Sequence, residues 1–134
     1  MIINLTQHPA SPDQVQAGVV DLTGEVRAEL IDALTFDEPP SPLEIIDRAI
    51  EVAELAGHNG LGDDEGDDPL PQQAMIGGAL WLMAPLAIEL RARGIEPVFA
   101  FSVRETVEAV QADGSVRKTA IFRHAGWVAA VSVA

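Results

Sequence analysis

The segment that most constrains the fold is residues 74–90. Ala74-Met75-Ile76 is apolar and β-prone, Gly77-Gly78 follows as a diglycine turn, and residues 79–90 form a long apolar run. A buried strand, a tight turn and a helix in this order form the basic unit of a parallel α/β sheet. In such sheets the turn lies at the carboxyl edge, where ligands bind. We therefore expect residues 74–76 to be a core strand and Gly77-Gly78 to lie at a ligand-binding edge.

Further elements are expected on both sides of this unit. Short β-prone runs over residues 2–5 and 19–22 predict two strands, and the continuously apolar residues 97–101 predict a buried one. N-cap residues and prolines at first helical positions predict the helix starts. We expect helices that begin after Ser11, Thr23, Ser41 and Gly78, with Gly57 and Gly94 as C-terminal glycines and a kink or restart at Pro85.

The C-terminal third carries a hairpin signal. Two β-prone runs, residues 106–110 and 116–122, flank Ala112-Asp113-Gly114-Ser115, and Asp-Gly between such runs predicts a β-hairpin. Residues 127–131 are expected to be a strand or a docked tail. The resulting fold class is α/β: a single small Rossmann-like domain over residues 1–134, with a mainly parallel core sheet, helices on its faces and a C-terminal β-hairpin. Residues 57–72 are expected to form a flexible acidic loop.

Composition excludes several classes of function. The net charge of −13 argues against binding to duplex DNA, which needs a basic surface. Cysteine is absent, so disulfides and thiolate chemistry are excluded. No apolar run reaches the ~20 residues of a membrane span, and the N-terminus lacks a basic signal region, so a cytoplasmic protein is expected. The sequence has no zinc, calcium-loop, dinucleotide or P-loop motif, and we expect neither metal nor cofactor.

Three polar groups are expected to meet at the carboxyl edge, provided that strands 2–5, 74–76 and 98–101 are parallel neighbours. The turn glycines and the amides of the following helix suit a phosphate, and Arg104 would give it a bidentate contact. The three groups are Asn4, Thr6, Gln7 and His8; Gly77 and Gly78; and Ser102, Arg104, Glu105 and Thr106.

Each of these features also has a structural interpretation. The diglycine segment is equally a tight turn alone, and His8 is also explained as a residue that hydrogen-bonds within its loop. His124 follows a β-prone run, where a structural or dimer-interface role is an equal alternative. Arg104 and Glu105 are equally an ion pair at the base of a hairpin. The sequence leaves these alternatives open.

Residues 3–12, Ile-Asn-Leu-Thr-Gln-His-Pro-Ala-Ser-Pro, resemble the start of small CRISPR-associated proteins, in which a strand precedes an N-[LF]-[ST]-x-H-P-like stretch. Those proteins accompany type III CRISPR systems, and several bind or degrade cyclic oligoadenylates, as ring nucleases or as sponges. The Met-Ile-Gly-Gly turn and residues 100–105 are compatible with that group and with related phage proteins. The resemblance implies a Rossmann-like homodimer that holds one cyclic nucleotide, cyclic tetra-adenylate first, across its two-fold axis.

Cleavage of such a ring needs no metal if the site aligns a ribose 2′-hydroxyl with its own phosphate. Arg104 or helix amides would stabilise the developing charge, and His8 or His124 would act as acid or base. Two alternatives remain. One is a non-catalytic module that binds a phage or host protein, which the acidic surface and the hairpin favour. The other is an enzyme that acts on another nucleotide or a phosphorylated metabolite at the same turn.

Overall fold

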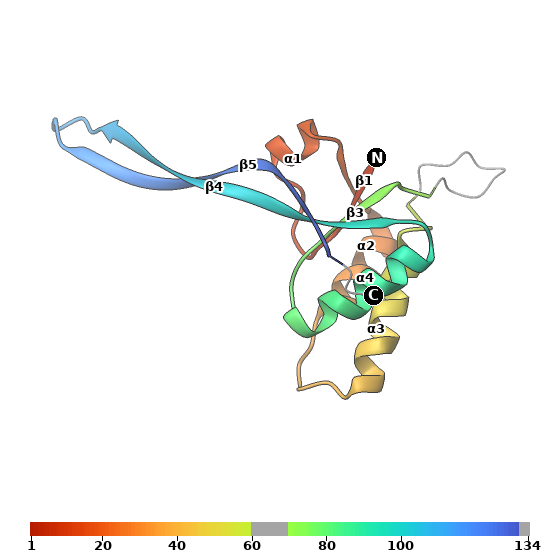
Figure 1. Ribbon diagram of the computed structural model, residues 1–134. Helices are drawn as coiled ribbons and strands as arrows, with labels where there is room; N and C mark the ends of the chain where they lie inside the picture. Colours follow the sequence, from red (N-terminus) through yellow and green to blue (C-terminus); the bar gives the residue numbers. More distant parts are fainter. Residues whose placement is uncertain (60–69, 132–134) are drawn as a thin grey trace.

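The computed structural model describes residues 1–59 and 70–131 and shows the expected α/β architecture (Figure 1). Most of the expected loop over residues 57–72 lies outside the described residues. The elements follow the chain as β1 (Ile2–Leu5), α1 (Pro12–Gln16), β2 (Val19–Asp21), α2 (Gly24–Leu34), α3 (Pro42–Leu55), β3 (Gln73–Ile76), α4 (Leu80–Ala92), β4 (Glu96–Val110) and β5 (Val116–Ala129).

The five strands form one sheet in the order β2-β1-β3-β4-β5. β1 pairs in parallel with both β2 and β3, β3 pairs in parallel with β4, and β5 is antiparallel to β4. The mainly parallel sheet with an antiparallel C-terminal pair is therefore confirmed. From β1 the chain moves first to β2 on one side and later to β3 on the other, so the strand order reverses between β1 and β3.

The helices cover the two faces of the sheet unequally. α2, α3 and α4 lie together on one side, and α1 lies on the other (Figure 1). Ile3, Leu5 and Ile76 point from the sheet into the main core on the three-helix side. Residues of opposite parity, including Ile2 and Met75, form a smaller cluster on the side of α1. Among the described residues, no helix has the length and apolar character needed to cross a membrane.

Local signals placed most helix ends correctly. Ser11 and Gln14 form a reciprocal capping box, and Ser41 accepts a hydrogen bond from the Glu44 amide. Gly94 adopts a φ of +77°, and the next amide donates back to the Leu90 carbonyl, as in a glycine-terminated helix. One expectation is wrong, because α3 ends on Ala56 in a right-handed conformation, without a left-handed Gly57. At Pro85, where a kink or a restart was expected, α4 continues as one helix, so the helix does not restart there.

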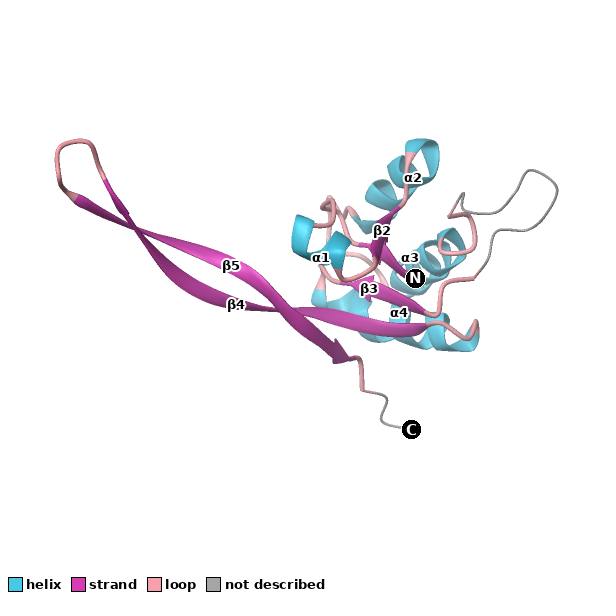
Figure 2. Cartoon of the chain, turned by 90° about the horizontal axis from the view of Figure 1, so that it is seen from above, coloured by secondary structure: helices cyan, strands magenta, loops and turns pink. Residues whose placement is uncertain are grey.

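The largest difference from expectation is the length of the hairpin. β4 spans 15 residues and β5 spans 14, and they pair over their length with a bulge at Phe101/Ser102. The expectation that a strand ends at residue 101 is therefore wrong. The expectation that Phe101 is buried is also wrong, since this residue is 52% exposed. Residues 102–125, which we call the arm, project from the rest of the protein as a two-stranded ribbon (Figure 2). Ser102-Val103-Arg104-Glu105 has a polar composition typical of a loop, but a ribbon with both faces in water accommodates it equally well.

Candidate ligand-binding pocket

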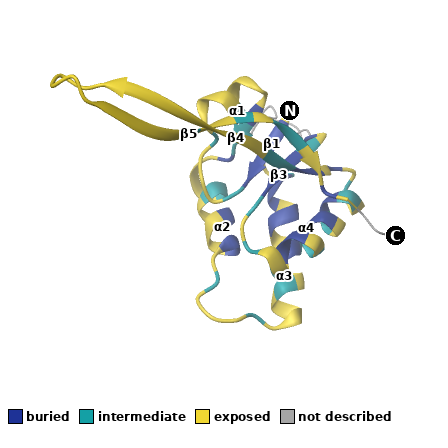
Figure 3. Cartoon of the chain, turned by 60° about the vertical axis from the view of Figure 1, so that its left-hand side comes forward, coloured by how far each residue is buried: buried dark blue, intermediate teal, exposed yellow. Residues whose placement is uncertain are grey.

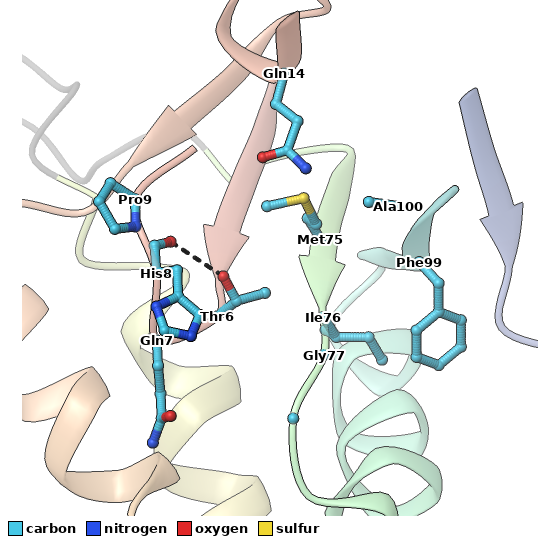
Figure 4. Close-up of a pocket in the computed structure, with 11 residues that line it drawn as sticks. Thr6, Gln7, His8, Pro9, Gln14, Met75, Ile76, Gly77, Phe99 and Ala100 are labelled. Atoms are coloured by element: carbon cyan, nitrogen blue, oxygen red, sulfur yellow. Dashed lines mark hydrogen bonds between the residues drawn. The ribbon is translucent and has the colours of Figure 1, made fainter. Parts of the chain in front are cut away.

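A cavity of about 430 Å³ lies where the strand order reverses. In open α/β sheets ligands bind at this position, outside the carboxyl ends of the strands, and the volume falls within the usual range for small-molecule sites. Its walls come from the loop after β1, the end of β3 with its turn, the inner part of β4, and α1 (Figure 4). The lining residues are Thr6, Gln7, His8, Pro9, Gln14, Met75, Ile76, Gly77, Gly78, Phe99 and Ala100.

Asn4 organises the first wall from below. Its side chain is completely buried. The Nδ2 group donates to the His8 carbonyl over 2.8 Å and to Asp21 Oδ1 over 2.7 Å. Its Oδ1 accepts from the Thr6 amide over 2.9 Å and from Thr6 Oγ1 over 2.6 Å. Both donors and both lone pairs of the amide are thus used within the protein. Asn4 lies outside the lining and positions Thr6 and His8 within it.

Asp21 and Arg27 support the same loop, and the sequence interpretation included neither. Asp21 Oδ1 accepts from the Ala10 amide over 3.0 Å in addition to its bond from Asn4. The Arg27 Nη2 group lies 3.5 Å from the Gln7 carbonyl, while its buried Nη1 has no hydrogen-bond partner among the described residues. Both residues are distant from the loop in sequence, and the position of Asp21 within an expected strand, residues 19–22, was the one sequence signal for its role.

Gln7 and Gln14 line the pocket from different elements. The Gln7 Nε2 group donates to the Leu34 carbonyl over 3.2 Å, which ties the loop to the end of α2. Gln14 was not among the expected site residues. Its Oε1 accepts from the Ser11 amide in the capping box of α1, and this fixes the side chain beside the pocket. The capping motif was the sequence signal that could have located it.

The diglycine turn forms the second wall. Gly78 has a φ of +125°, a conformation that favours glycine. A Cβ atom on Gly77 would lie 3.7 Å from Thr6 Cγ2, so the turn and the β1 loop are in close contact. Ala79, the N-cap of α4, makes no side-chain capping bond. The first amides of α4 therefore receive no side-chain acceptor from Ala79, but residues 79–82 are not among those that line the pocket.

The third expected group is not in the pocket. Ser102, Arg104, Glu105 and Thr106 lie on the arm, and Phe99 and Ala100 form the β4 wall instead. The prediction that all three polar groups meet is wrong for this group, because β4 continues as a strand beyond residue 101. Glu105 forms an ion pair with Arg123 over 2.5 Å. The roles of the arm residues as ligand contacts within one subunit therefore have no geometric basis.

His124 also lies on the arm. It is opposite Ser102 in the strand pair, and its ring centre is 4.6 Å from that of Trp127. Its Nδ1 atom is buried without a hydrogen-bond partner among the described residues. Of the three residues expected to take part in catalysis, only His8 lines the pocket.

The charge of the pocket differs from that of the whole chain. The protein has 21 acidic residues and a net charge of −13, yet no lining residue is acidic and His8 is the ionisable one. The carboxylate of Asp21, which supports the loop of the first wall, accepts hydrogen bonds from Asn4 and from the Ala10 amide. Within residues 1–59 and 70–131, no three His, Asp or Glu side chains gather as metal ligands would. The pocket thus offers amides, hydroxyl and imidazole to a ligand, which are groups that bind anions.

No curated protein and no solved structure matches the chain. One family model, described as the uncharacterized protein MJ1673 family, matches residues 1–128. The matched range includes every lining residue of the pocket and the whole arm. The chain therefore belongs to the uncharacterized protein MJ1673 family.

Proposed function

We propose that the protein binds a cyclic oligoadenylate at the pocket between β1 and β3, with cyclic tetra-adenylate as the first candidate. The observation that carries the proposal is the meeting of the Thr6–His8 loop with the Gly77-Gly78 turn at the reversal of strand order. The backbone amides of the Gly77-Gly78 turn and the absence of lining carboxylates suit a phosphate. The resemblance of residues 3–12 to CRISPR-associated proteins selects cyclic oligoadenylates among phosphate-containing ligands.

A homodimer fits this ligand class. A cyclic oligonucleotide presents the same phosphate and base repeatedly, and a two-fold symmetric dimer presents the same loop and turn twice. One ring across the axis would place a phosphate at each diglycine turn. The proposal implies that the protein acts in the cytoplasm, either in type III CRISPR signalling or in a phage response to it.

Cleavage of the bound ring is the activity that the same site would support. The ribose 2′-oxygen attacks the adjacent phosphorus, the bond to the 5′-oxygen breaks, and the products are a 2′,3′-cyclic phosphate and a 5′-hydroxyl. The proton lost by the 2′-hydroxyl goes to a base, and the leaving 5′-oxygen gains one. His8 is the ionisable group of the lining, and the backbone amides of the Gly77-Gly78 turn, which lines the same pocket, would stabilise the phosphorane charge.

The test is isothermal titration of the purified protein with cyclic tetra-adenylate in EDTA, followed by chromatography of the products. We expect saturable binding of one ring per two chains. Gly77→Ala places a methyl group in the pocket wall and should weaken binding at least about tenfold, a loss of ~1.4 kcal/mol. Gly57→Ala is the matched control, because its Cβ would meet only ordinary contacts away from the pocket. Absence of both binding and linear product with any ring size overturns the proposal.

A second candidate is an enzyme that acts on a mononucleotide or a phosphorylated metabolite. The cavity volume of about 430 Å³ favours it, because this size suits one small ligand. A thermal-shift series of mononucleotides and sugar phosphates separates the two candidates. A ligand that stabilises the protein at concentrations above its dissociation constant, while the rings do not, supports the second.

A further inference from the structure

The arm has little contact with the rest of its own subunit. From Ser102 outward, β4 pairs with β5 alone among the described strands, and the arm is exposed along its length (Figure 3). Its base meets α1, where Asp13 and His124 line one small cavity. An isolated two-stranded ribbon is at best marginally stable in water. A projecting ribbon of this length is therefore expected to gain its rigidity from another surface.

Both faces of the arm carry large apolar side chains. Directly opposed residues in an antiparallel pair share a face, so Phe122 lies beside Arg104 on one face, and Ile121 beside Glu105 on the other. Phe122 is 72% exposed and Val110 is 77% exposed. Val103 and Val107, on the face of Ile121, are also exposed. Apolar surface gathered in this way on a projecting element is typical of a protein–protein contact.

The arm and the rest of the chain carry net charges of opposite sign, which indicates what kind of surface the arm would bind. The arm holds four of the eight Lys and Arg residues of the chain but three of its 21 acids, so its net charge is +1. The remaining residues hold four bases and 18 acids, so their net charge is −14. Within the arm, Glu105 pairs with Arg123 and Glu108 with Lys118. Arg104 and Arg117 form no ion pair with any described residue, so the unpaired charges of the strands are cationic.

We propose that the arm of one subunit docks on the acidic body of a second copy of this chain, and that the two subunits exchange arms about a two-fold axis. The charge complementarity between arm and body is the main argument, because it makes the body of another copy the matching surface. This proposal stands whether or not a nucleotide binds.

The direction of the arm agrees with such an exchange. β4 runs parallel to β1 and β3, so its continuation beyond Phe101 projects past the carboxyl edge on which the pocket opens. Two subunits that face each other across this edge would each receive the arm of the other. On the body, Glu25, Glu29 and Asp32 lie at helical spacing along the exposed side of α2. None of the three forms an ion pair with a described residue, which makes α2 a suitable surface for the arginines of the arm.

The first test is the oligomeric state without ligand, measured by sedimentation equilibrium on the full chain and on a shortened arm. Removal of residues 106–109 together with 117–120 deletes four opposed pairs and keeps the remaining side chains on their faces, since four is even. The full chain should be a dimer, and the shortened protein should be a monomer. The helical signal in its far-ultraviolet circular dichroism spectrum should be unchanged. A monomeric full chain, or a shortened protein that dimerises as tightly, overturns the proposal.

A charge reversal tests the same contact without shortening the arm. Arg117→Glu should raise the dissociation constant of the dimer about tenfold, and added salt should weaken the wild-type dimer. Arg91→Glu changes the net charge equally on α4, away from the arm, and should leave the constant within about twofold. Equal effects of the two variants would show that net charge alone matters, and would contradict docking of the arm.

Discussion

Asn4 and Asp21 join the carboxyl ends of β1 and β2 through a hydrogen bond of 2.7 Å from Asn4 Nδ2 to Asp21 Oδ1. The pair also holds the loop after β1, because Asn4 binds Thr6 and His8 while Asp21 binds the Ala10 amide. Both ends of the loop are attached to this one pair. The shape of the pocket wall therefore depends on two side chains of which one is fully buried and neither lines the pocket.

Asn4→Ala should lower the free energy of unfolding by about 2–4 kcal/mol, because it leaves Asp21, the Thr6 amide and the His8 carbonyl without their shared partner. Asp21→Asn should cost less than about 1 kcal/mol, since one amide oxygen can accept both bonds that Oδ1 accepts now. Urea denaturation of the two variants measures the difference. Equal losses would mean that the charge of Asp21, and not the network geometry, stabilises the loop.

The two turn glycines should respond differently to the same substitution. Gly78→Ala forces a side chain onto a φ of +125° and should destabilise the protein by about 1–3 kcal/mol. Gly77→Ala meets only Thr6 Cγ2, at 3.7 Å, and should leave stability within about 1 kcal/mol of wild type. Thermal denaturation of both variants, read at the same pH, checks the order. A larger loss at Gly77 would contradict the geometry of the turn.

Local sequence signals predicted the parts of this structure that depend on neighbours in the chain. The N-caps Ser11 and Ser41 and the Gly77-Gly78 turn were predicted correctly, because cap and turn chemistry acts over a few residues. Asp21 and Arg27 were missed because they reach the loop only through strand pairing and helix packing. The arm was misread for another reason: a ribbon with both faces in water and a loop share the same polar composition, and the hairpin signal at Asp113-Gly114 fixes a turn but not the length of its strands.

Arg48 should be the most sensitive surface arginine of the body. Its Nη1 group lies within hydrogen-bond distance of the Asp32, Ala33 and Thr35 carbonyls at the end of α2, at 3.0, 3.0 and 2.8 Å. Its guanidinium also lies 4.9 Å from the centre of the Phe36 ring. Arg48→Ala should lower the free energy of unfolding, measured by urea denaturation, by about 2–3 kcal/mol. Arg48→Lys should recover only part of this loss, because an ammonium group lacks the planar, forked set of donors of a guanidinium.

Glu44→Gln is the control for that prediction. Glu44 forms an i,i+4 ion pair with Arg48 over 3.2 Å, and such exposed pairs contribute about 0.5 kcal/mol or less. The control variant should therefore be close to wild type in the same denaturation experiment. A loss as large as that of Arg48→Ala would show that the ion pair, and not the carbonyl contacts, accounts for the effect.

The turn at the tip of the arm should respond to pH through Asp113. Hydrogen bonds from the Ser115 side chain over 2.5 Å and from its amide over 2.9 Å lower the pKa of Asp113 below the ordinary 3.8. The charged form is thus favoured in the folded turn. Its stabilisation is complete above the unfolded value of 3.8 and is lost as the pH falls through the lower folded pKa.

Nuclear magnetic resonance titration of the Asp113 carboxyl should therefore give a midpoint below 3.8. Ser115→Ala removes the larger of the two causes and keeps the amide, so it should return the midpoint part of the way toward 3.8. A midpoint that the substitution leaves unchanged would show that the hydroxyl does not hold the turn.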